Sequence, residues 1–220
     1  IINIFEKNGK INSNGIKELI GLDRFEARKL LVKKLKENGH LVKIDNIKNK
    51  VPYGDRSNSI IEPLLKEQWF VNAKKLSKKP IKIVNEGKTS FFPKNWTKTF
   101  YQWMKDIEPW CISRQIWWGH RIPAWYDEYD NIFVAENAKD AKLLAKKKNK
   151  NNSFKLRQET DVLDTWFSSA LWPFATLGWP IKTKEFLKFY PTSVLVTGFD
   201  IIFFWVARML MMGNYFNKQT

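Results

Sequence analysis

The segment 193–205 combines residue types that can hold a small ligand at the end of a strand. Residues 193–196 (SVLV) are mostly apolar and predict a buried β-strand, and Gly198 predicts the turn into an apolar helix that starts near Asp200. A strand that leads into a helix through a glycine turn is typical of a doubly wound α/β fold. In such folds, ligands bind at the carboxyl ends of the strands, over the helix N-termini. The Asp200 carboxylate is expected at that point.

An apolar wall follows this carboxylate. Ile201 and Trp205 are one helical turn apart and therefore share a face of the predicted helix. A carboxylate accepts hydrogen bonds from hydroxyl groups, and the apolar side chains can bury an aliphatic group. The pattern favours a small ligand that carries both groups, although most strand–glycine–helix turns serve only as scaffold.

The N-terminal part of the chain predicts a helix followed by a strand. Asp23 and Glu26 have the spacing of a capping box, which opens a helix that ends at Asn38 and Gly39. A weak alternation of apolar and polar residues over 41–51 predicts a half-buried strand.

The central part of the chain predicts a helix, a hairpin and a second helix. Asn95 can cap the first helix, and its apolar residues recur on one face. The residues of that face are Trp96, Phe100, Trp103, Met104 and Ile107. Residues 127–134 indicate a hairpin, and 138–148 indicate a short amphipathic helix.

Composition and charge limit the class of protein. Hydrophobic residues make up 44% of the 220, which is typical of a globular chain. The net charge of +16 favours a polyanionic partner such as nucleic acid, because lysine and arginine neutralise phosphates. The abundance of lysine, asparagine and isoleucine allows a second interpretation, a compositional drift of the source genome.

Neither a metal site nor a membrane span is expected. The single cysteine, Cys111, excludes an internal disulfide, and with only His40 and His120 the chain cannot supply a tetrahedral set of zinc ligands. We interpret His120 as structural or substrate-adjacent. The most apolar stretch, 201–212, is too short to cross a bilayer and predicts a core helix.

Several tryptophan-rich blocks resemble one protein family. In chain order these blocks are 21–28 (GLDRFEAR), 61–63 (IEP), 68–70 (QWF), 106–125 (DIEPWCISRQIWWGHRIPAW), 161–172 (DVLDTWFSSALW) and 194–205 (VLVTGFDIIFFW). They resemble the class I aminoacyl-tRNA synthetases and, among these, the valyl-tRNA synthetase family. The isoleucyl- and leucyl-tRNA synthetases share the architecture but differ in the amino-acid sequence of these blocks.

The resemblance implies an α/β fold with a partial, doubly wound Rossmann-type catalytic domain preceded by the tail of a mixed α/β editing domain. Residues 1–60 would be the C-terminal part of the editing domain and a return linker. Residues 61–125 would be the first part of the catalytic domain, 126–158 an insert, and 159–220 the incomplete second part. In many relatives the insert carries zinc-binding cysteines, and here it has none, so no zinc is expected in this span.

The resemblance also implies the reaction and the residues that bind its substrates. Trp166 and Trp205 would wall the amino-acid pocket, with Ile201 at its end. The reaction would be ATP-dependent activation of valine and its transfer to tRNA(Val), with hydrolytic editing of mischarged tRNA in the full-length enzyme. Adenylyl transfer depends mostly on positioning and charge stabilisation, so no catalytic nucleophile or base is expected among these residues.

The same resemblance places ATP, with its magnesium, near Thr197, Gly198 and Asp200, where Asp200 would hold the ribose. The sequence contains neither a His-x-Gly-His nor a Lys-Met-Ser-Lys-Ser motif. In the family these motifs lie upstream and downstream and handle the ATP phosphates, so we expect an internal fragment that is inactive by itself. The expected protein is cytoplasmic, monomeric and not bound to a membrane. The alternatives are an isoleucyl-tRNA synthetase and a non-catalytic, basic nucleic-acid-binding module.

Overall fold

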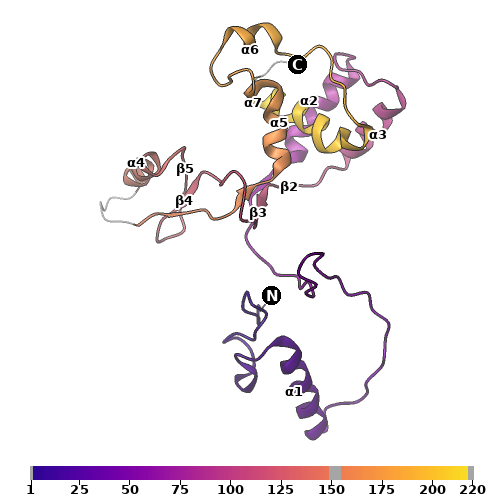
Figure 1. Ribbon diagram of the computed structural model, residues 1–220, viewed down its shortest axis with the longest axis vertical. Helices are drawn as coiled ribbons and strands as arrows, with labels where there is room; N and C mark the ends of the chain where they lie inside the picture. Colours follow the sequence, from indigo (N-terminus) through magenta and orange to yellow (C-terminus); the bar gives the residue numbers. More distant parts are fainter. Residues whose placement is uncertain (1, 149–154, 218–220) are drawn as a thin grey trace. The chain divides into compact units, whose positions relative to one another are not determined.

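The computed structural model describes residues 2–148 and 155–217 (Figure 1). The chain divides into two compact units, Ile1–Glu67 and Gln68–Thr220. Both helices and strands occur among the described residues, which confirms a mixed α/β class.

The first unit is built around helix α1 (Arg24–Glu37). The Asp23 carboxylate caps this helix, since it accepts a hydrogen bond from the backbone N–H of Phe25 at 2.9 Å. After the helix ends, Gly39 adopts a φ of 72°, which a glycine reaches without strain. The predicted start and end of this helix are therefore confirmed.

The core of the first unit is small. A 3₁₀ turn, η1 (Lys17–Leu19), places Leu19 against α1, and Phe5, Leu30 and Leu31 pack around the buried side chains. Those buried side chains are Ile11, Leu19 and Ala27.

Residues 41–51 do not form the strand that their alternation predicted. Val42 is 99% exposed and Ile47 is 81% exposed, and the segment has no regular secondary structure. A strand is stabilised by the backbone of a neighbour. None of the strand pairings among the described residues involves this segment, so its alternation had no sheet to join.

The second unit has a helical core in which segments far apart in the sequence lie together (Figure 1). Its helices are α2 (Ala73–Asn85), α3 (Asn95–Lys105), α5 (Thr165–Ala175), α6 (Lys184–Phe189) and α7 (Arg208–Phe216). The largest fully buried side chains include Phe100 of α3, Phe174 of α5 and Met211 of α7. Burial of such side chains is the main source of stability for this part of the chain.

Helix α3 presents the face that its sequence predicted. Phe100, Met104 and Ile107 are buried, while Trp96 and Trp103 are half-buried at the edge of the same face. Asn95, the predicted cap, is instead the first residue of the helix. The cap position is occupied by Lys94, whose side chain makes no capping hydrogen bond.

Strand pairing in the second unit is antiparallel throughout the described residues. The sheets pair β1 (Phe70–Val71) with β2 (Trp110–Cys111), β3 (Ser113–Arg114) with β7 (Val162–Leu163), and β4 (Ala124–Tyr126) with both β5 (Ile132–Val134) and β6 (Arg157–Gln158). The predicted hairpin is confirmed in β4 and β5, and the predicted helix that follows is confirmed as α4 (Ala138–Lys148).

Residues 193–196 do not form the buried strand that their apolar character predicted. Val194 is 75% exposed and Val196 is 90% exposed, and no regular secondary structure is present. A parallel strand buried on both faces needs neighbouring strands and covering helices. The described part of the chain contains no strand that pairs with this segment.

The apolar segment that follows is helical over Phe199–Phe216, 18 residues in all. It begins as a 3₁₀ turn, η2 (Phe199–Ile201), continues as a π-helix, η3 (Ile202–Ala207), and ends as α7. Its length and mean hydropathy of 1.2 meet the requirement for a membrane span. However, Met211 and Met212 are buried in the core of the second unit, so we assign the segment to that core, as its sequence predicted.

Candidate functional site

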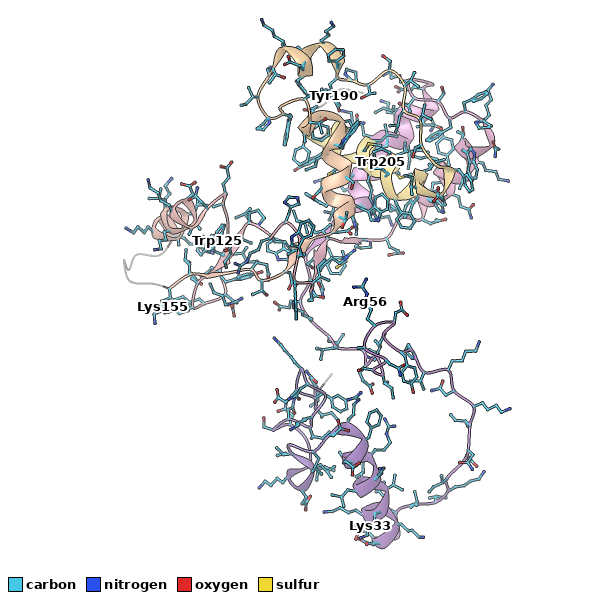
Figure 2. The ribbon with its side chains drawn as sticks, in the orientation of Figure 1. Lys33, Arg56, Trp125, Lys155, Tyr190 and Trp205 are labelled. Atoms are coloured by element: carbon cyan, nitrogen blue, oxygen red, sulfur yellow. The ribbon has the colours of Figure 1, made fainter. Side chains whose placement is uncertain are left out.

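Two of the predicted wall residues, Trp166 and Trp205, lie on opposite sides of the contact between α5 and η3. The Trp166 ring stacks on Phe204, with ring centroids 5.7 Å apart. The indole N–H of Trp205 donates to the Ser169 carbonyl oxygen at 3.0 Å, and its ring lies edge-on to Trp172 at 6.3 Å. Trp205 lies among the helices of the second unit in Figure 2. The fold therefore brings both tryptophans to one interface, although they come from separate sequence blocks.

Ile201 lies at the end of η2 and is half-buried. The backbone from Ile202 to Ala207 is π-helical, so the α-helical spacing from which we predicted a shared face with Trp205 does not apply. A π-helix has a wider turn and is frequent at functional sites. The π-helical turn therefore favours a functional role for the segment that contains Trp205.

Thr197, Gly198 and Asp200 lie just before this helical run. Asp200 is exposed and lies in the first turn of η2. A Cβ atom on residue 198 would lie 2.5 Å from the Asp200 Oδ1 atom, so a larger residue there would displace this carboxylate from its present position. The Thr197 hydroxyl is buried and has no hydrogen-bond partner among the described residues. Unpaired buried hydroxyls are uncommon, and the two groups together can bind a polar ligand.

A buried charged cluster that the sequence did not predict lies where α5 begins, with Asp164 at its centre. The Asp164 carboxylate accepts a hydrogen bond from the Trp110 indole N–H at 2.9 Å. It also lies 3.3 Å from the Arg114 guanidinium and 3.5 Å from that of Arg208. Removing one partner from such a buried pair generally costs about 3–5 kcal/mol.

Arg208 could have been identified from the sequence, because it is the only cation in the apolar run 199–216. A charge in a core helix needs a partner of opposite charge. Arg208 is only 9% exposed, and its guanidinium lies 4.0 Å over the Trp110 ring. Burial lowers the pKa of Arg208 from its ordinary value, and the charge of Asp164 opposes that shift.

A second polar cluster joins the segment before β1 to the three-stranded sheet. The Glu159 carboxylate accepts hydrogen bonds from the Tyr126 hydroxyl at 2.6 Å and the Trp69 indole N–H at 3.1 Å. Burial acts to raise the pKa of Glu159, but these hydrogen bonds and those from backbone amides outweigh it and hold the pKa at about 2. Burial, together with the Glu159 carboxylate, raises the pKa of Tyr126 to about 12.

We expect this cluster to weaken in acid, because the pKa of Glu159 is lower in the folded protein than its ordinary value of 4.5. The stabilisation is fully present above that value and is lost as the pH falls towards about 2. Glu159→Gln should remove it at neutral pH as well. Hydrogen exchange of 122–126, corrected for intrinsic rates, should rise with falling pH in the unsubstituted protein and be high throughout in the variant. The exposed Glu136→Gln is the control, and equal exchange in the two variants would contradict the assignment.

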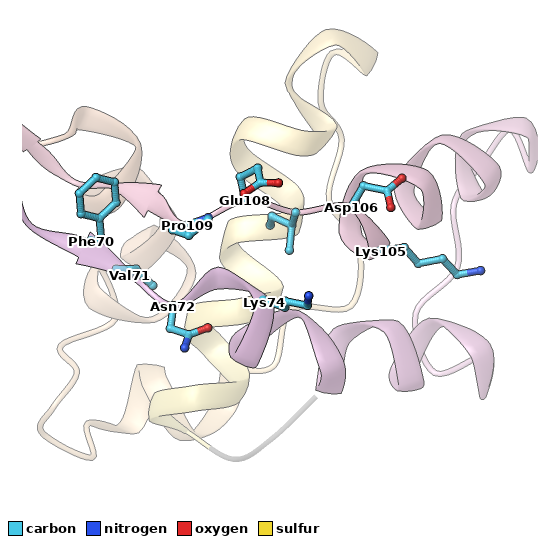
Figure 3. Close-up of a pocket in the computed structure, with 9 residues that line it drawn as sticks. Phe70, Val71, Asn72, Lys74, Lys105, Asp106, Glu108 and Pro109 are labelled. Atoms are coloured by element: carbon cyan, nitrogen blue, oxygen red, sulfur yellow. The ribbon is translucent and has the colours of Figure 1, made fainter.

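Cavities in the second unit do not coincide with the predicted site residues. One cavity of about 700 Å³ lies between the start of α2 and the end of α3, with Lys74 and Lys105 at its edge (Figure 3). Another, of about 290 Å³, is lined by Arg114 and Arg208 together with apolar side chains. Within the described ranges, no group of three or more histidine, cysteine, aspartate or glutamate side chains can hold a metal ion.

Comparison with known proteins places the chain. The family model for tRNA synthetases class I (I, L, M and V) matches residues 7–220. The chain is 68% identical over 216 residues to the valine–tRNA ligase of Pelagibacter ubique (strain HTCC1062), covering 98% of this chain and 25% of that protein. It is 54% identical over 219 residues to the valine–tRNA ligase of Caulobacter vibrioides, covering 100% of this chain and 24% of that protein.

The same relation holds for the valine–tRNA ligase of Legionella pneumophila (strain Lens), which is 56% identical over 218 residues, covering 99% of this chain and 23% of that protein. The chain thus spans about a quarter of the length of the curated relatives that it matches. Because the family model covers nearly all of its residues, the chain belongs to the class I tRNA synthetases (I, L, M and V).

Proposed function

We propose that this chain is part of a valine–tRNA ligase that activates valine with ATP and transfers it to tRNA(Val). The observation that carries the proposal is the 68% identity to a protein of that name over 98% of the chain. The position of Trp166 and Trp205 at one interface supports it further, since these two residues come from separate blocks of the sequence.

In this proposal, Trp166, Ile201 and Trp205 form the amino-acid pocket. An aliphatic side chain such as that of valine is bound by burial against apolar surface. Trp166 and Trp205 are both half-buried, so each retains surface for a ligand. The π-helical turn that carries Trp205 supports a functional assignment for this segment.

Thr197, Gly198 and Asp200 bind the adenosine part of ATP in this proposal. The exposed Asp200 carboxylate can accept hydrogen bonds from both ribose hydroxyls, and the unpaired Thr197 hydroxyl adds a further polar contact. ATP enters with magnesium as a substrate. The described residues then position the nucleotide and take no part as nucleophile or base.

We further propose that the domain organisation follows the family. Residues 1–60 are the end of the editing domain, 61–125 and 159–220 belong to a doubly wound Rossmann-type catalytic domain, and 126–158 are an insert. The compact unit Ile1–Glu67 is consistent with the first boundary. Exposed Val194 and Val196 leave apolar surface that other parts of the enzyme can cover.

The whole enzyme is proposed to be a cytoplasmic monomer that also hydrolyses mischarged tRNA. The net charge of +16 supports phosphate contacts with tRNA(Val) through lysine and arginine side chains. The absence of cysteines from residues 126–158 supports an insert without zinc.

The full-length protein should catalyse valine-dependent exchange of pyrophosphate into ATP and should charge tRNA(Val). The test compares valine, isoleucine, leucine and methionine in the exchange reaction, followed by aminoacylation with purified tRNA. Preference for isoleucine would replace the proposal with an isoleucyl-tRNA synthetase. Exchange with none of the four amino acids would favour a nucleic-acid-binding protein without ligase activity.

A further inference from the structure

Asp164 lies where an aspartate would normally cap a helix, but its side chain binds residues of other segments. It occupies the N-cap position of α5, but its side chain makes no capping hydrogen bond. Instead, its carboxylate is buried and engages Trp110, Arg114 and Arg208. The Asp164 side chain therefore connects the start of α5 to other segments of the second unit, and it does not cap the helix. Trp166 lies two residues further along the chain.

Arg208, the partner of Asp164, lies on the helical segment that carries Trp205. It is the residue at which η3 ends and α7 begins, and Trp205 lies three residues before it. Its guanidinium stacks over Trp110 at 4.0 Å and lies 5.6 Å from the centre of the Phe204 ring. Since Phe204 is the ring on which Trp166 stacks, Arg208 also contacts the packing partner of the opposite wall.

The ion pair thus joins the two segments that carry the proposed pocket walls. Its two side chains are 8% and 11% exposed, so water screens their attraction only weakly. The other described links between these segments are uncharged: ring contacts, among them Phe174 with Phe216, and one hydrogen bond from Trp205 to Ser169. The Arg208 guanidinium, which is planar and charged, lies over the Trp110 ring and 3.5 Å from the Asp164 carboxylate, although its Nη1 atom has no hydrogen-bond partner among the described residues.

We propose that Asp164 and Arg208 are positioning residues that fix Trp166 and Trp205 relative to each other and so set the enzyme's affinity for, and choice of, its amino acid. The inference rests on the proposed function for the identity of the amino acid, but the geometric link between the two segments does not. Neither residue needs to touch the substrate. Displacing a wall by about 1 Å is enough to change reaction rates by about 10²-fold when geometry decides catalysis.

The test uses the full-length protein with Arg208→Met, which keeps an unbranched stem and removes the guanidinium and its charge, and with Asp164→Asn, which keeps the shape of the side chain. We expect the KM for valine to rise about tenfold in each, a typical size for coupling within one charged network. The KM for ATP should change less than about twofold, and discrimination against isoleucine should fall. Arg208→Lys should restore part of the loss. In the double variant, the effects should be smaller than the product of the single ones.

The matched control is Arg157→Met, since Arg157 also pairs with an aspartate, Asp130, at 3.0 Å but on the exposed insert. It should leave both KM values unchanged. Hydrogen exchange of 165–169 and 202–207 gives a readout that needs no activity, and it should rise in Arg208→Met and Asp164→Asn but not in the control.

The outcomes separate this inference from the proposed function. If the unsubstituted protein does not activate valine, the proposed function fails, and hydrogen exchange still decides whether the pair links the two segments. If valine is activated and either folded variant keeps the original valine KM and selectivity, the positioning role is overturned. An equal rise in the KM for valine and for ATP would overturn it too, because a general loss of structure is not selective. Should Arg208→Met fail to fold, Asp164→Asn supplies the same decision.

Discussion

Replacing Trp205 by alanine in the full-length protein is expected to raise the KM for valine about tenfold or more, because it removes one of the two indole walls of the proposed pocket. The indole also donates to the Ser169 carbonyl oxygen and packs on Trp172, and alanine would lose both contacts. The enlarged space should accept isoleucine. One methylene changes binding in an apolar pocket by about 1–3 kcal/mol, so discrimination against isoleucine should fall by at least about tenfold.

Asp200→Ala is the matched comparison, since it should weaken the use of ATP and leave the choice among amino acids nearly unchanged. Pyrophosphate exchange with valine, isoleucine and threonine measures both variants, after circular dichroism has shown that each is folded. If Trp205→Ala keeps the original kinetics and selectivity, Trp205 is an ordinary core residue. The proposed role of Ile201 then fails as well, because it depends on the same pocket.

Phe174→Ala is expected to destabilise the second unit by about 3–5 kcal/mol, the usual cost of removing a buried phenylalanine ring. Phe174 is fully buried at the middle of an aromatic group that joins α5 to α7. Its ring centroid lies 5.3 Å from that of Trp179, 5.7 Å from Tyr190 and 6.3 Å from Phe216. The cavity left by alanine has no side chain nearby that can fill it without moving these rings.

The unfolding midpoint in urea, monitored by hydrogen exchange of α5 and α7, measures this loss of stability within the larger protein. Phe189→Ala is the control, because Phe189 has the same side chain but is 54% exposed at the end of α6. A surface substitution of this kind changes stability by about 0.5 kcal/mol or less. Equal unfolding midpoints for the two variants would show that the aromatic group does not form the core.

The elements that the sequence predicted correctly are those that local interactions determine. Asp23 caps α1 through a hydrogen bond two residues away, and the buried face of α3 follows from apolar residues at helical spacing. The hairpin of β4 and β5 forms between strands that are neighbours in the chain. In each case the partners are close in sequence, so the pattern contains the information that is needed.

The strands predicted at 41–51 and 193–196 were wrong for the opposite reason. A strand is completed by hydrogen bonds to a segment that its own sequence does not specify, and these two segments have no such partner among the described residues. The spacing of Ile201 and Trp205 was also misjudged, because an apolar run does not reveal that its backbone will be π-helical. Trp166, Trp205 and Asp200 remain predictions as binding residues.

The sequence by itself determined the family of this protein, because several long, tryptophan-rich blocks occur in one order. It also determined the helices whose residues are spaced to bury one face. Only the tertiary structure decided which of those blocks touch. It placed Asp164 against Arg208 and Trp166 against Phe204, pairs whose members are distant in the chain. The physical reason is that burying a charge or a ring requires a partner, and the choice of that partner depends on how all the segments pack together.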